Sequence, residues 1–119
     1  MLEIEHENQY QYNEDVLNWL KNNNSPFFDW IIIIAFYTSL HKIDQCLHKR
    51  GFNDFQIGSH IKRNNLVINN LPTTICTEYI KLYSKSRVVR YKQDTLYDIK
   101  SEDLQDYLDI WFKTIKPFN

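Results

Sequence analysis

The chain has 119 residues, enough for one domain with a hydrophobic core but few enough that much of its surface stays in contact with water. Its two glycines and three prolines are too few for a sandwich or barrel of many short strands, and its formal net charge of −1 differs from that of the strongly basic domains that adhere generally to nucleic acid. The apolar residues recur mostly at steps of three and four, the spacing of one helix face. We therefore predict a single all-α domain over residues 1–119.

The charges are unevenly distributed along the chain. Residues 1–39 hold six acidic residues and one lysine, and residues 93–119 hold six acidic residues and three lysines. Residues 40–92, in contrast, hold ten Lys or Arg and only three acidic residues. A basic centre between two acidic ends suits a local site for phosphate.

Caps and helix breakers predict the first two helices. A short first helix over about residues 14–21 ends at the polar stretch 22–25, where Ser25 can act as a cap and Pro26 suits the first helical position. The second helix runs to about residue 50 and stops at Gly51. It is apolar on all sides over residues 31–34 and carries Phe36 in an apolar stripe, so we expect it to be the central and most buried element.

Three further segments complete the predicted bundle. Ser59 can cap a third helix through about residue 68, and Pro72 marks the start of a fourth that ends at about Tyr91. Residues 92–100 show no clear period and are predicted to be an exposed connection. Ser101, followed by two acidic residues that favour the positive end of the helix dipole, starts a last helix that ends before Pro117. The result is a bundle of four or five helices.

Cysteine usage and hydropathy bear on the location of the protein. Cys46 and Cys76 each fall on the apolar face of a predicted helix, without a CxxC motif, and we interpret both as free buried thiols. The opening segment is acidic, and the longest apolar run, residues 30–37, is far shorter than the roughly 20 residues that span a bilayer. We expect a soluble, cytoplasmic protein with no membrane association and no cofactor.

A polar stripe on the second helix raises the question of a metal site. Tyr37, His41, Asp44 and His48 follow one another at steps of four, three and four, which places them on one side of the helix. His41, Asp44 and His48 could be metal ligands. Histidine and aspartate at this spacing are nevertheless common on half-exposed polar faces, and no second ligand cluster occurs in the sequence. We therefore predict no metal.

Two arginines and two tyrosines share one face of the fourth helix. Arg87 and Arg90 are three residues apart, with Tyr83 one turn before Arg87 and Tyr91 one turn after it. The forked donors of two neighbouring guanidinium groups fit phosphate oxygens. A structural role is equally open, in which an acid pairs with the arginines. The candidates for that acid are Asp44, Asp98 or a residue of a partner chain.

His60 and Arg63, three residues apart, lie at the start of the third predicted helix. The helix dipole disfavours the charged form of a histidine at this end, so a neutral His60 could act as a base near pH 7. A structural histidine bonded to backbone is the alternative. We predict that His60, Arg87 and Arg90 line one pocket for a phosphate-bearing ligand, with RNA as the best match, and that these three residues are its catalytic candidates. The binding candidates are His41, Arg63, Tyr83 and Tyr91.

These segments together resemble the HEPN superfamily of small helical domains. The resemblance covers about residues 29–97. It rests on Asp29-Trp30, the Phe36-Tyr37…Leu40-His41 pattern, the His60…Arg63 pair and Ser86-Arg87…Arg90-Tyr91. It implies an antiparallel helical bundle that usually dimerises. It also implies either a metal-independent ribonuclease of a defence or toxin–antitoxin system, or a noncatalytic binding module.

One departure from the family pattern bears on catalysis. HEPN ribonucleases carry an arginine followed roughly four to six residues later by a histidine, whereas no histidine follows Arg87 or Arg90 in this chain. The base would have to come from elsewhere in space, with His60 or His41 as candidates. Two functions therefore stay open. One is a metal-independent ribonuclease, and the other is a noncatalytic dimeric module that binds RNA, a nucleotide or a partner protein such as an antitoxin.

Aromatic residues predict the oligomeric state. The chain holds more aromatic surface than so small a bundle easily buries, and aromatics are favoured at interface cores. The residues concerned are Trp30, Tyr37, Tyr107, Trp111 and Phe112. We therefore predict a homodimer.

Overall fold

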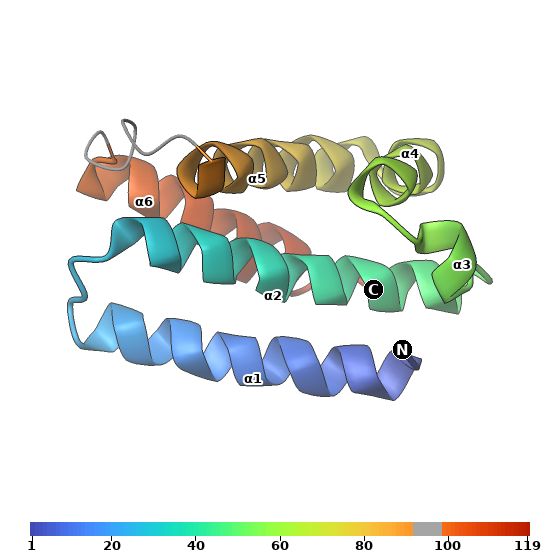
Figure 1. Cartoon of the computed structure of the whole chain (residues 1–119), viewed down its shortest axis with the longest axis horizontal. Coiled ribbons are helices and arrows are strands. Elements are labelled where there is room, and N and C mark those ends of the chain that lie inside the picture. The colour runs from blue at the N-terminus through green and yellow to red at the C-terminus, as the bar shows by residue number, and fades with distance from the viewer. Residues whose placement is uncertain (92–98) are drawn as a thin grey trace.

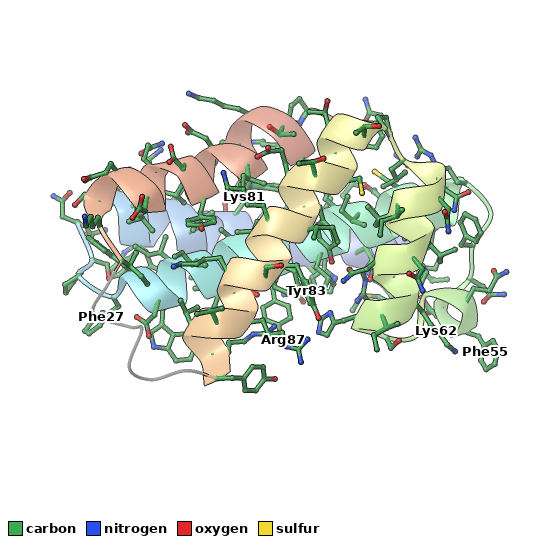
Figure 2. The ribbon with its side chains drawn as sticks, turned by 90° about the horizontal axis from the view of Figure 1, so that it is seen from above. Phe27, Phe55, Lys62, Lys81, Tyr83 and Arg87 are labelled. Atoms are coloured by element: carbon green, nitrogen blue, oxygen red, sulfur yellow. The ribbon has the colours of Figure 1, made fainter. Side chains whose placement is uncertain are left out.

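The computed structural model describes residues 1–91 and 99–119, and within them the chain is all helical, with no strand. The helices are α1 (Glu3–Asn22), α2 (Phe28–Lys49), α3 (Asp54–Ile57), α4 (His60–Asn70), α5 (Thr73–Tyr91) and α6 (Ser101–Asp109), which continues as a π-helical segment, η2 (Ile110–Ile115). Helices α1 and α2 run antiparallel along the long axis (Figure 1), whereas α4 and α5 cross α2, as the view from above shows (Figure 2). The prediction of an all-α helical bundle is confirmed.

The central position of α2 follows from its sequence. Thirteen of its 22 residues are buried, with Phe36 at 0% exposure, and it contacts α1, α4, α5, α6 and η2. Ile31 and Ile32 are buried, whereas the two isoleucines after them are only partly buried. A helix covered by neighbours on several sides needs apolar residues beyond a single stripe, which explains the isoleucine run.

Helix α1 is longer than its sequence predicts. It begins at Glu3, not near residue 14, and lies along α2 over much of its length (Figure 1). Only His6 and Leu17 are fully buried in it. Because one of these two is polar, the first turns show no apolar period, and the packing against α2 stabilises a segment that periodicity does not reveal.

The boundaries of the later helices agree better with their sequence signals. The Ser59 hydroxyl accepts a hydrogen bond from the backbone N–H of Lys62 at 3.2 Å, so this residue caps α4 as predicted. Helix α5 ends at Tyr91, also as predicted. Residues 92–98 of the predicted connection lie outside the described residues. Helix α3 is a single turn that periodicity cannot detect.

Trp111 joins the C-terminal segment to α1. The indole is fully buried and its Nε1 donates to Glu14 Oε2 at 2.9 Å, while Lys116 Nζ lies 2.7 Å from the other oxygen of Glu14. Trp111 therefore belongs to the core and not to the surface aromatic set predicted above, in which Trp30 remains 57% exposed.

Both cysteines are free, although only Cys46 is fully buried. Within the described residues, no helix combines the length and the apolar character that crossing a membrane requires.

Candidate functional site

A cavity of about 340 Å³ opens between the start of α4 and the second half of α5. Its lining residues come from these two helices and the cap of α4. They are Ser59, His60, Ile61, Tyr83, Arg87, Arg90 and Tyr91. Figure 2 shows Tyr83 and Arg87 on the side of α5 that faces α4, whereas Lys81 lies on the other side. Five of the seven predicted site residues thus share one cavity.

Arg90 is held firmly at the inner wall of this cavity. Its Nη1 donates to the Tyr37 hydroxyl at 2.6 Å and its Nε donates to the Ser86 carbonyl at 3.2 Å. The centre of the guanidinium group lies 5.5 Å from the ring centre of Phe36 and 5.3 Å from that of Tyr91, within the range of cation–π attraction. These contacts fix the charge in a partly buried position.

Arg87 is the more exposed arginine, and its Nη1 lies 3.4 Å from the Tyr83 hydroxyl. Of the acids predicted to pair with the two arginines, Asp44 bonds Arg63 instead and Asp98 lies outside the described residues. Among residues 1–91 and 99–119, no carboxylate forms an ion pair with Arg87 or Arg90.

His60 lies against the same aromatic wall. Its ring centre is 5.4 Å from that of Tyr83 and 5.9 Å from that of Phe36. Burial lowers the pKa of His60 below its usual value, and the charges of Arg63 and Arg90 lower it further. A lowered pKa of His60 agrees with the sequence prediction, which was based on the helix dipole. The structure adds two further causes, burial and the charges of the neighbouring arginines. The imidazole is therefore neutral near pH 7.

The tautomer of the neutral His60 ring follows from its contact with Arg63. Nδ1 of His60 lies 3.3 Å from Nη1 of Arg63. A guanidinium group can only donate, so Nδ1 is the acceptor and the ring proton resides on Nε2. In this state His60 offers a ligand an N–H donor, and its lone pair is already engaged.

Arg63 itself does not line the cavity. It forms two hydrogen bonds to Asp44 of α2, and the side chains of the two residues are only 12% and 5% exposed. Burial works against the charge of Arg63, but the hydrogen bonds to Asp44 and the negative charge of that residue together outweigh it and raise the pKa of Arg63. Arg63 therefore positions His60 and joins α4 to α2, and it lies outside the lining of the cavity that holds most of the predicted site residues.

His41 also lies away from the cavity. Its Nδ1 is 3.0 Å from Nδ1 of His6 in α1. The possible metal ligands predicted on α2 therefore contact three different partners. His41 contacts His6, Asp44 bonds Arg63, and Nε2 of His48 lies 2.8 Å from Oδ1 of Asp54. His6 was missed by the sequence analysis, since a single histidine in a polar segment gives no signal of where it packs.

A second hollow of about 450 Å³ adjoins the cavity along α5. Tyr83, Arg87 and Tyr91 line both. Tyr91 is 73% exposed, so its aromatic ring is accessible from solvent between the two hollows. A ligand longer than one small molecule could follow this side of α5.

In comparison with known proteins, no family model, curated protein or solved structure matches this chain. The chemistry of the cavity follows from its own groups. Two guanidinium groups, an imidazole N–H and the tyrosine hydroxyls are mainly hydrogen-bond donors, and two of these groups are permanently charged. Such a set suits an anion with several oxygens, above all a phosphate.

Proposed function

We propose that the chain is a HEPN-like, RNA-directed domain that binds single-stranded RNA in the cavity between α4 and α5. The observation that carries this proposal is that His60, Arg87 and Arg90 line one open cavity. Arginine forks bind phosphate oxygens in pairs, and a fixed guanidinium such as that of Arg90 loses little freedom when a ligand arrives.

The tyrosines favour RNA over free phosphate. Tyr91 is exposed beside the arginines, and Tyr83 is shared by the two adjoining hollows. Bases of single-stranded nucleic acid stack on such rings while basic residues contact the backbone, and each stacked base contributes about 1–3 kcal/mol. Phosphate donors next to an accessible ring supply both parts of this arrangement.

The state of His60 favours the noncatalytic form of this function. Cleavage without a metal would require a base that takes the proton from the ribose 2′-hydroxyl as that oxygen attacks the adjacent phosphate. The neutral His60 carries its proton on Nε2 and accepts from Arg63 at Nδ1, so it can donate to a phosphate oxygen but has no free lone pair. A ribonuclease of a defence or toxin–antitoxin system is the second candidate and requires His60 to leave Arg63.

The proposal includes a homodimer. Trp30, at 57% exposure, and Phe27, at 61%, lie three residues apart at the start of α2, and a second copy of the chain could cover them. Aromatic residues are enriched at the cores of such interfaces. An antitoxin-like protein partner would compete with the second copy of the chain for this exposed aromatic surface at the start of α2.

RNA binding is tested by fluorescence anisotropy with a short labelled oligonucleotide at moderate salt. Arg87→Ala should weaken binding about tenfold, as expected for a charge-assisted hydrogen bond, and should lower the salt dependence by about one released ion. Lys81→Ala is the matched control, because it removes the same charge from the same helix outside the cavity. Equal binding by parent and Arg87→Ala, or an equal loss in both variants, would refute the site.

Cleavage is tested on the same oligonucleotide in the presence of a chelator. Binding without cleavage supports the noncatalytic module. Cleavage that continues in chelator and is lost in His60→Gln would establish the metal-independent ribonuclease instead. Circular dichroism of the variant confirms that the fold is intact.

A further inference from the structure

A second cluster of polar side chains lies outside this cavity, where the start of α1, the end of α2 and α3 meet. The ring centre of His6 is 5.2 Å from those of His41 and His48. Nε2 of His48 lies 2.8 Å from Oδ1 of Asp54, whose other oxygen bonds the amino group of Met1. Ligand atoms of His6, His48 and Asp54 all lie within 4.8 Å of one another.

His6 has an unsatisfied nitrogen in this cluster. The residue is only 4% exposed, and its buried Nε2 has no hydrogen-bond partner among residues 1–91 and 99–119. Native structures rarely leave such a buried polar atom unpaired, so an orphan of this kind calls for a ligand, water or ion. His6 lies on α1, outside the predicted stripe on α2, and supplies a ligand that this stripe lacked.

The contact between His6 and His41 defines which atom of His6 is available. Two Nδ1 atoms at 3.0 Å can share only one proton between them. If His6 is the donor, its Nε2 carries the free lone pair.

We propose that His6, His48 and Asp54 bind a divalent transition metal ion, with zinc as the best match, and that His41 orients His6. Two imidazoles and one carboxylate are ligands that zinc accepts, and water would complete the tetrahedron. Ligand distances of about 2.0–2.2 Å place neighbouring ligand atoms about 3.4 Å apart. The ligand atoms of the three residues already lie within 4.8 Å of one another, and an ion would widen the 2.8 Å separation between Nε2 of His48 and Oδ1 of Asp54. A ligating histidine normally donates its other N–H to a nearby acceptor, and His41 Nδ1 is that acceptor.

The ion would have a structural role. Its three ligands come from α1, the last turn of α2 and the first residue of α3. The start of α1 has few buried apolar residues of its own, and a metal would attach this end to the rest of the bundle. This site is separate from the cavity lined by Arg87 and does not depend on RNA binding.

The test is a metal titration of the whole chain, purified without a polyhistidine tag and freed of metal with chelator. Zinc should bind one equivalent in competition with a chromogenic chelator and should raise the thermal midpoint, and cobalt should give the visible absorption of a tetrahedral site. Asp54→Asn and His48→Gln should each weaken binding by more than about 100-fold, since loss of an orienting partner alone costs about 10–100-fold. His41→Asn should fall within that smaller range.

Two control variants test whether a loss of zinc binding is specific to the proposed ligands. Asp103→Asn removes an exposed acid of α6, and His60→Gln removes a histidine of the other site, so both should bind zinc like the parent. His6→Gln alters a buried residue and its fold must be checked, whereas Asp54 is 54% exposed at its side chain and gives a clean variant. No binding by the parent at micromolar concentrations, unchanged binding by Asp54→Asn, or an equal loss in Asp103→Asn would overturn the proposal.

Discussion

Arg63 of α4 and Asp44 of α2 form a buried ion pair with two hydrogen bonds, from Nε to Oδ1 at 2.6 Å and from Nη2 to Oδ2 at 3.1 Å. The same guanidinium group contacts Nδ1 of His60 at 3.3 Å. One side chain therefore connects the core to the edge of the cavity. The position and the tautomer of His60 both depend on it.

Asp44→Asn should lower the free energy of unfolding by about 3–5 kcal/mol, because it leaves the charge of Arg63 buried without a counter-charge. Urea denaturation followed by circular dichroism measures this loss. Replacing both partners, as in Asp44→Leu with Arg63→Met, should be less destabilising than the single change, since no unpaired charge remains. A single variant as stable as the parent would show that the pair is open to water in solution.

Phe36→Ala should cost about 3–5 kcal/mol of stability, because the ring is fully buried in the centre of α2. Phe55→Ala is the matched control. Phe55 is 83% exposed and contacts Lys62 at the surface (Figure 2), so its loss should cost less than about 1 kcal/mol. Equal denaturation midpoints for the two variants would contradict the central position of α2.

The pKa of His60 should lie below the usual 6.5 in the free protein, because burial and the neighbouring guanidinium groups disfavour its charged form. The unfolded chain takes up this proton near 6.5, so the contribution of His60 to stability is present above that pH and is lost as the pH falls toward the folded pKa. Proton NMR titration measures the value, and His60→Gln assigns the signal.

Inorganic phosphate should raise the pKa of His60, since an anion in the cavity favours the imidazolium form. By linkage, phosphate should bind more tightly as the pH falls through this pKa. A value at or above 6.5 without phosphate, or no response to phosphate, would contradict the arrangement described for the cavity.

The homodimer is expected to appear in light scattering at micromolar protein as twice the chain mass of 14.5 kDa. Trp30→Arg should shift the mass to that of the monomer if the exposed start of α2 is the interface. Trp19→Arg changes an equally exposed tryptophan, at 63%, on α1 and should leave the dimer intact. A parent protein at the monomer mass would exclude a site shared between two copies.

Much of the fold could be predicted from local sequence. The apolar run around Phe36 identified the central helix, and Ser59 and Pro72 marked where the next two helices begin, because caps and helical period are properties of neighbouring residues. The start of α1 could not be predicted. Its stability comes from packing on α2 around a buried histidine, which leaves no apolar period in the sequence.

The same distinction between local sequence and tertiary packing applies to the candidate site. The shared face of Tyr83, Arg87, Arg90 and Tyr91 was determined by the sequence, since residues three and four apart on a helix must lie together. Only the tertiary structure decided which histidine joins them. His60 meets the arginines because the start of α4 lies beside the second half of α5, whereas His41 contacts His6 and Arg63 bonds Asp44. Helical spacing fixes the faces of each element, but the partner of each face depends on how the whole bundle packs.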